Sequence, residues 1–198
     1  MNVYDFDNTI YNGESSIDFF LYVLSKNKTL SKYLPLTGYS LLLYKAGLLS
    51  INKIQDIANR YTDIVIKYQD DINDLINGFW EKYSYKLKTV FLNRIESNDI
   101  IITASPRILI DGIKNRINTN NIICSEINMK TGKLEYLCMG ENKVKALYER
   151  YPDIEINEFY TDSIKNDIHL INIANKPYLV KGNHVVPILK KEPNKHHR

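Results

Sequence analysis

The sequence has little that would suit a disulfide-stapled, nucleic-acid-binding or secreted protein. It contains only two cysteines, Cys124 and Cys138, and they lack the spacing of metal ligands. We therefore expect a reduced, cytoplasmic protein. The formal net charge is only +3, and much of the excess lies in residues 190–198, so nothing indicates a broad nucleic-acid surface. The N-terminus has no basic region followed by an apolar one, and no signal peptide is predicted.

Long apolar runs are also missing. The most apolar stretch, residues 33–49, is interrupted by Pro35, Gly38 and Lys45. It is shorter than the roughly 20 residues that a membrane-spanning helix needs. We expect a buried helix or a helix–helix contact there, with a surface that touches lipid or a partner as the alternative. Stable membrane insertion is not predicted.

The order of the predicted elements indicates an α/β protein. Residues 2–6 predict a short buried strand, whereas residues 15–97 read as successive amphipathic helices. From residue 99 onward, strands alternate with helices, a pattern that favours a doubly wound, Rossmann-like parallel sheet. The expected strands are 99–104, 121–127 and 156–162, with a hairpin at 128–136 and a final strand at 176–180.

Polar residues occur at four places along the chain, each just after a predicted strand or hairpin. Asp5 and Asp7 come directly after the first strand, and Thr103 comes after the second. Lys143 begins the helix after the hairpin, and the pair Asp162 and Asp167 follows the strand at 156–162. Ligands of doubly wound sheets bind beyond the carboxyl ends of the strands. We therefore expect these side chains to converge.

Such a set of residues suits phosphoryl transfer. Grouped carboxylates repel one another without a cation, and oxygen ligands of this kind favour Mg²⁺. A lysine and a hydroxyl can bind phosphoryl oxygens. One aspartate could attack phosphorus, while the other acts as general acid and then as general base.

The same motifs resemble those of the haloacid dehalogenase superfamily of phosphatases, and most closely its phosphoserine-phosphatase-like branch, subfamily IB. "DFDNT" resembles the first motif and "IIITASP" the second, while "GENKVKAL" and "TDSIKND" resemble the third and fourth. The resemblance covers nearly the whole chain. It implies an α/β core formed by residues 1–13 and 84–198, with an α-helical cap inserted at residues 14–83.

The resemblance also implies a role for each matching residue. Asp5 would be the nucleophile and Asp7 the acid/base. Mg²⁺ would be held by Asp5, the backbone carbonyl of Asp7 and Asp162, with Asp167 as a supporting acid. The phosphoryl group would be bound by Thr103, Lys143 and the backbone N–H groups of Phe6 and Ala104.

Several assignments stay open. Thr161 replaces the usual glycine of the fourth motif, and Asn166 competes with Asp167 for the second acid position. Lys145 is the competitor of Lys143. Ser105 is expected to cap the following helix.

Two residues of the helical segment have more than one possible role. Glu14 resembles a glutamate that contacts the substrate amino group in phosphoserine phosphatases, or it is simply an acid at a helix N-terminus. Arg60 could bind a substrate carboxylate or a second phosphate, but a surface role is expected.

The predicted function is Mg²⁺-dependent hydrolysis of a small phosphate monoester through an aspartyl-phosphate intermediate. A phosphatase of lipid or isoprenoid phosphates is the alternative. A phosphotransferase and a non-catalytic binding module on the same fold are further rivals. The expected partner is a small-molecule phosphomonoester, without nucleic acid, and the chain is expected to be a monomer or a homodimer.

Overall fold

The computed structural model describes residues 1–26, 28–33, 35, 39–40, 43, 48–67 and 72–190. Most of the apolar stretch at 33–49 therefore lies outside the described residues, as does the tail from residue 191 onward. Within the described part, no helix is both long and apolar enough to cross a bilayer.

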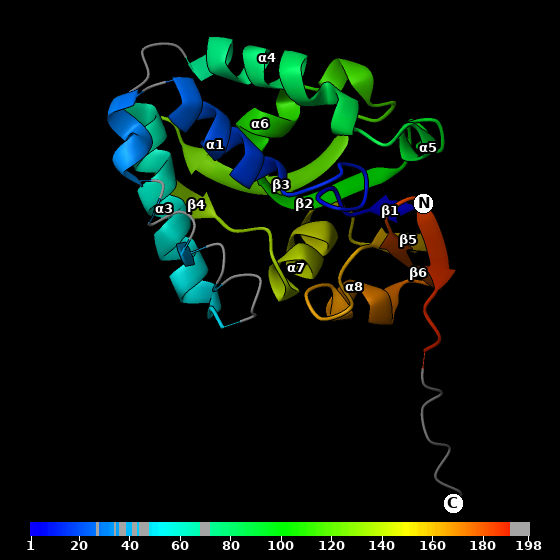
Figure 1. Ribbon diagram of the computed structural model, residues 1–198. Helices are drawn as coiled ribbons and strands as arrows, with labels where there is room; N and C mark the ends of the chain where they lie inside the picture. Colours follow the sequence, from blue (N-terminus) through cyan, green and yellow to red (C-terminus); the bar gives the residue numbers. More distant parts are fainter. Residues whose placement is uncertain are drawn as a thin grey trace, which may run out of the picture.

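A mostly parallel sheet forms the centre of the molecule (Figure 1). Its seven strands lie in the order β4-β3-β2-β1-β5-β6-β7, and β4 and β7 pair antiparallel at the two edges. The strand β7 was not predicted. The bounds are β1 Val3–Tyr4, β2 Ile100–Pro106, β3 Asn121–Asn128, β4 Lys133–Tyr136, β5 Glu158–Thr161, β6 Lys176–Lys181 and β7 His184–Pro187.

Helices cover both faces of this sheet, which confirms the predicted doubly wound α/β class (Figure 1). The α-helices are α1 Ser15–Lys26, α3 Ile51–Lys67, α4 Ile72–Tyr83, α5 Thr89–Leu92, α6 Arg107–Asp111, α7 Glu141–Arg150 and α8 Ile168–Ile173. Short 3₁₀ turns are η1 Lys28–Tyr33, η2 Ser84–Lys86 and η3 Lys114–Arg116.

The helix α5 is shorter than the apolar pattern of residues 87–95 predicts. The backbone before it is held by the N-terminal loop: Leu87 forms an isolated bridge with Tyr11, and the N–H of Lys88 donates to the carbonyl of Ile10 at 2.8 Å. This pairing keeps residues 87 and 88 out of the helix.

Side chains that alternate along the strands form two separate cores. Val3, Ile100 and Phe159 pack under α7 and α8. The next residue along each strand points to the other face, where it packs with Phe79 and Trp80 of α4 and with α6. The Trp80 indole donates a hydrogen bond to the Leu109 carbonyl at 2.7 Å. One end of α4 therefore shares its core with the sheet.

A third apolar cluster joins α1, η1 and α3. It contains Phe20, Leu30 and Ile64, which are all buried. The Phe20 and Tyr61 rings stack with their centroids 4.4 Å apart. Because α3 also contacts β4, the helices after the first acid pair form a wall beside one edge of the sheet (Figure 1).

Candidate active site

The position of β1 in the middle of the sheet brings the polar strand ends together. Tyr4, its last residue, pairs with Ile101 of β2 on one side and with Tyr160 of β5 on the other. The residues that follow β1 therefore leave the sheet between those that follow β2 and β5. Asp5 and Asp162 leave from adjacent strands in this way.

The loop that carries the acid pair is tightly folded. The Phe6 carbonyl accepts hydrogen bonds from the N–H groups of Ile10 and Tyr11 at 2.8 and 2.9 Å. Asn8 has a φ of 56°, in the left-handed region that asparagine tolerates better than most residues. This turn sends the chain from Asp7 towards the start of α1.

The Lys143 ammonium lies between two carboxylates. It donates to Asp5 Oδ1 and to Asp167 Oδ1, each at 2.8 Å. All three side chains are buried. The second oxygen of Asp167 accepts a hydrogen bond from the Thr161 hydroxyl at 2.6 Å. Asp167 is thus held from both sides, and it orients Lys143 against Asp5.

Burial dominates the electrostatics of this cluster. Desolvation raises the pKa of Asp5 well above its ordinary value, although the Lys143 ammonium opposes this effect. Desolvation and the charge of Asp167 raise the pKa of Asp162. The attraction of Asp5 and Asp167 outweighs burial for Lys143, whose pKa is raised. The site therefore contains more buried negative charge than one ammonium neutralises.

Asp7 is held by hydroxyl and amide groups rather than by a cation. Its Oδ2 accepts a hydrogen bond from the Ser105 hydroxyl at 2.7 Å, and its Oδ1 accepts one from the Ser15 N–H at 2.6 Å. The Ser105 hydroxyl also lies 2.8 Å from the hydroxyls of both Ser15 and Ser16. Burial raises the pKa of Asp7, and these hydrogen bonds limit the rise.

The expected helix cap at Ser105 is wrong. The N-cap of α6 is Pro106, and no side chain caps that helix. The Ser105 hydroxyl points to Asp7 instead, because Ser105 still belongs to β2 and lies beside the loop after β1. Thr103, two residues earlier, is buried and accepts a hydrogen bond from the Ser105 N–H at 3.0 Å.

The competing residues of the third and fourth motifs differ in how far they are buried. Lys145 is exposed and pairs with Glu141 at 3.5 Å, whereas Lys143 is buried in the site. Asn166 is exposed, and Asp167 is the acid that contacts Lys143.

The remaining candidates lie at the edge of the site or outside it. Phe6 is buried and Ala104 is half-buried, both next to site residues in sequence. The Glu14 carboxylate accepts a hydrogen bond from the Asn8 side chain at 2.8 Å. Arg60 is exposed on α3, as expected for a surface residue.

Sequence reasoning missed Ser15, Ser16 and Lys88. The serines are ordinary for a helix start, and no motif pointed to them. Lys88 is buried, and its ammonium donates to the carbonyls of Asn8 and Gly182. Burial lowers its pKa, and the charge of Asp162 opposes this effect. Only the tertiary structure places this cation near the acid loop.

The donor set fits a hard divalent cation that keeps several waters. Asp5, Asp162 and the Asp7 carbonyl are oxygen donors, and the excess buried negative charge favours a cation. Among the described residues, no group of three Asp, Glu, His or Cys side chains could hold a metal by itself. Mg²⁺, which is commonly bound by one or two carboxylates plus water and phosphate, suits such a site better than a metal that needs a full protein cage.

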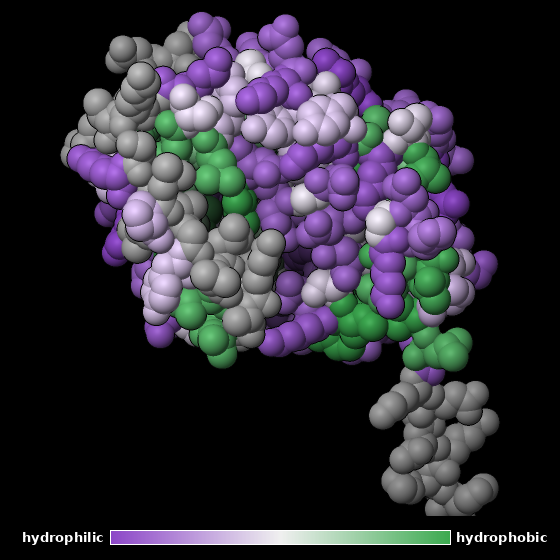
Figure 2. Space-filling view, in the orientation of Figure 1, coloured by the Kyte–Doolittle hydropathy of each residue, from purple (hydrophilic) through white to green (hydrophobic). Residues whose placement is uncertain are grey.

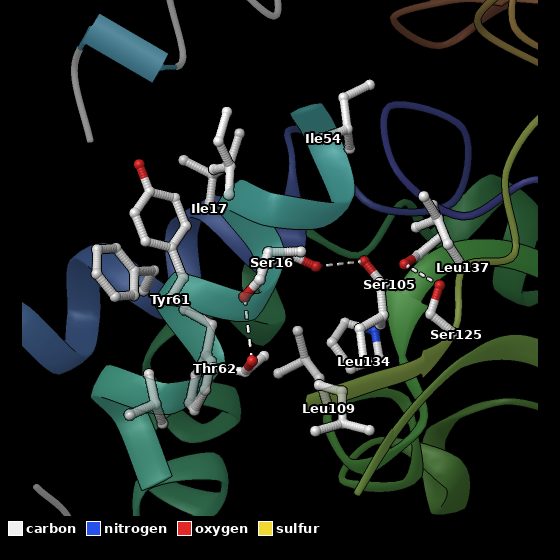
Figure 3. Close-up of a pocket in the computed structure, with 18 of the residues that line it drawn as sticks. Ser16, Ile17, Ile54, Tyr61, Thr62, Ser105, Leu109, Ser125, Leu134 and Leu137 are labelled. Carbon is white, nitrogen blue, oxygen red and sulfur yellow. Dashed lines mark hydrogen bonds between the residues drawn. The ribbon is translucent and has the colours of Figure 1, made fainter. Parts of the chain in front are cut away.

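A cavity opens beside Asp7. It has a volume of about 250 Å³, and Asp7, Glu14, Ser16 and Ser105 lie at its polar end. Figure 3 shows the Ser16 and Ser105 hydroxyls facing each other there, with apolar side chains around them.

The doubly wound sheet, with acids and a lysine gathered at the ends of its strands, defines an α/β protein with a candidate active site at one sheet edge. The chain matches the haloacid dehalogenase-like hydrolase family over residues 3–171, and it belongs to that family. The predicted family is thereby confirmed. Among curated proteins, none matches the sequence.

Solved structures of similar fold agree with this assignment. A protein of unknown function from Bordetella pertussis Tohama I has a TM-score of 0.75 at 15% identity, with 89% of this chain and 87% of that chain covered. A phosphoserine phosphohydrolase-like protein from Francisella tularensis subsp. tularensis SCHU S4 has a TM-score of 0.56 at 19% identity, with 89% and 86% covered. A phosphoserine phosphatase, solved as a phospho-aspartyl intermediate analogue, has a TM-score of 0.52 at 16% identity, with 88% and 83% covered. The predicted likeness to the phosphoserine-phosphatase branch is thus confirmed for the fold.

Proposed function

We propose that the protein is a Mg²⁺-dependent phosphatase that hydrolyses a phosphate monoester through an aspartyl-phosphate on Asp5. The observation that carries this proposal is the buried contact of Lys143 with Asp5 at 2.8 Å. A lysine in this place neutralises charge exactly where a carboxylate and an anionic phosphate must meet. The similar phosphoserine phosphatase that was solved as a phospho-aspartyl intermediate analogue supports it.

In the first step, an Asp5 carboxylate oxygen bonds to phosphorus while the bond to the leaving oxygen breaks. Asp7 donates a proton to that leaving oxygen. Asp7 suits this role because burial raises its pKa, which favours the protonated form. Ser105 and the Ser15 N–H hold its two oxygens in one orientation.

In the second step, Asp7 takes a proton from water, and the water oxygen attacks phosphorus. The bond to Asp5 breaks, and inorganic phosphate leaves. Thr103, Lys143 and the N–H groups of Phe6 and Ala104 would bind the phosphoryl oxygens. A bound Mg²⁺, held by Asp5, the Asp7 carbonyl and Asp162, would supply further charge neutralisation.

The helical segment 14–83 acts as the cap in this proposal. Its helix α1 begins next to Asp7, and its helix α3 forms the far wall of the cavity. A cap so placed would exclude water from the reaction and select the leaving group. A cytoplasmic location remains part of the proposal, supported by the free, buried thiols of Cys124 and Cys138.

The experiment is phosphate release from p-nitrophenyl phosphate with Mg²⁺, with EDTA in a parallel reaction. We expect turnover that EDTA abolishes and that falls at least about 1,000-fold in Asp5→Asn. Asp153→Asn removes an exposed acid in a turn and is the matched control. Full activity in Asp5→Asn would refute the mechanism.

Two rivals give different results in the same assay. A phosphotransferase would transfer phosphate to an added alcohol in preference to water. A non-catalytic binding module would release no phosphate under any condition, with Asp5 or without it.

A further inference from the structure

The cavity beside Asp7 differs from the catalytic cluster in its chemistry. Its walls are hydrocarbon: Ile17 of α1, Ile54 and Ile57 of α3, Leu109 of α6 and Leu134 of β4 line it. Figure 3 shows Ile17 on one side of the hydrogen-bonded Ser16 and Ser105 hydroxyls, and Leu109 and Leu134 on the other. Figure 2 shows hydrophobic side chains beside a hollow on the same side of the molecule. The polar site thus leads directly into an apolar chamber.

Two hydroxyl groups of the chamber wall, those of Thr62 and Ser125, have protein partners, whereas the buried Tyr61 hydroxyl has none among the described residues. The Thr62 hydroxyl bonds to the Ala58 carbonyl at 3.0 Å and to the Gly132 carbonyl. The Ser125 hydroxyl donates to the Ala104 carbonyl at 2.7 Å. A polar substrate group that entered the chamber would lose its water and gain few hydrogen bonds in return.

The helix α3, which forms one wall of the chamber, contacts the fold on two sides. The Leu134 N–H donates to Asn59 Oδ1 at 2.7 Å, which ties β4 to α3. Phe20 stacks on Tyr61, which ties α1 to the same helix. These contacts fix α3 against β4 and α1, so the chamber is part of the packed fold.

The acidic residues of the cavity lining disfavour one class of substrate. Asp7 and Glu14 are acidic, and none of the described residues that line the cavity is a lysine, an arginine or a histidine. A carboxylate on the leaving group would therefore lie near two acids, and like charges repel one another. This arrangement disfavours phosphoserine, although the fold resembles that of phosphoserine phosphatase-like proteins.

We propose that the leaving group is an alcohol with a hydrocarbon chain, and that the substrate is the phosphate monoester of an aliphatic or isoprenoid alcohol. This inference rests on the proposed phosphatase function and names its substrate class. The phosphate would lie beside Asp5 and Lys143, and the chain would pass Ser105 and Ile17 into the chamber.

The size of the chamber limits the chain length. An apolar cavity of about 150 Å³ binds benzene, so by the same ratio 250 Å³ suits on the order of ten carbon atoms.

The test is hydrolysis of n-alkyl phosphates from two to fourteen carbons, together with geranyl phosphate, all below their micelle-forming concentrations. We expect kcat/KM to rise about two- to fourfold per methylene and to level off near ten carbons. If geranyl phosphate exceeds decyl phosphate, the source is the isoprenoid class. Phosphoserine and phosphoethanolamine are the polar comparison, and higher kcat/KM values for either of them would overturn the proposal.

A variant fills the chamber without touching the catalytic groups. Ala58→Phe places a ring into the cavity from α3, whereas Asn52→Phe adds the same ring at an exposed position of that helix. We expect Ala58→Phe to lower kcat/KM for decyl phosphate at least tenfold and to leave p-nitrophenyl phosphate within about threefold. Asn52→Phe should change neither. Equal effects of both variants on decyl phosphate would overturn the proposal.

A binding measurement separates this inference from the proposed function. Isothermal titration with n-alkyl phosphonates, which cannot be hydrolysed, reports chain binding directly. Tighter binding with longer chains, lost in Ala58→Phe, supports the chamber even if no substrate is turned over. Turnover of p-nitrophenyl phosphate without any chain-length dependence of binding would refute the chamber alone.

Discussion

Replacing Lys143 with methionine should destabilise the fold strongly. Among the described residues, the Lys143 ammonium is the cation that contacts Asp5 and Asp167, at 2.8 Å from each, and the side chains of Lys143, Asp5 and Asp167 are 6%, 10% and 2% exposed. Methionine keeps most of the side-chain volume but leaves two buried carboxylates without their counter-charge. Breaking a buried pair in this way costs about 3–5 kcal/mol. The total free energy of unfolding of a typical domain is only about 5–15 kcal/mol.

The assay is thermal and urea unfolding followed by circular dichroism in buffer with EDTA, so that no divalent cation replaces the missing charge. For a chain of this size, 1 kcal/mol shifts Tm by roughly 2–4 °C, so Lys143→Met should lower Tm by roughly 6–20 °C. Asp167→Asn in the Lys143→Met background removes one of the two unpaired charges. This double variant should recover at least about 1 kcal/mol.

Lys145→Met is the matched control on the same helix. Its ammonium is 3.5 Å from Glu141, and both side chains are more than half exposed. An exposed pair contributes little, so we expect a loss below about 1 kcal/mol. If Lys143→Met destabilises the protein no more than Lys145→Met does, the buried bridge does not stabilise the fold, and the reasoning fails.

Two further predictions concern Ser105 and Cys124. Ser105→Ala removes a hydrogen bond to Asp7 and should lower kcat for p-nitrophenyl phosphate about tenfold with KM within about twofold; an equal change in KM, or none in kcat, would contradict a positioning role. Burial raises the pKa of the Cys124 thiol from 9.0 to about 12, so the folded state keeps a proton that the unfolded state loses above pH 9. The contribution of Cys124 to the free energy of unfolding should therefore fall by up to about 1.4 kcal/mol per pH unit between pH 9 and 12, so Cys124→Ala should show a fall that is shallower by that amount in urea titrations.

Local sequence patterns were enough for the family and the fold class, and they placed the main candidate site residues at the ends of strands. A continuous apolar run such as 100–102 is typical of a strand buried on both faces, and Ile100 and Ile102 lie in one core while Ile101 lies in the other. Parallel strands end at one edge of a sheet, so acids placed just after β1 and β5 must come near each other. This reasoning needs no knowledge of side-chain contacts.

The tertiary structure decided which side chain meets which. Whether Lys143 or Lys145, and Asp167 or Asn166, lies in the site depends on which face of a helix or turn is buried. The sequence pattern does not distinguish these near neighbours, but the structure buries only one of each pair. Ser105 meets Asp7 because two strands lie side by side, although 98 positions separate them in the chain. The chamber arises where α1, α3, α6 and β4 meet, and no single segment encodes a space between four elements. Sequence patterns report the local preference of each segment, whereas a cavity depends on how distant segments pack.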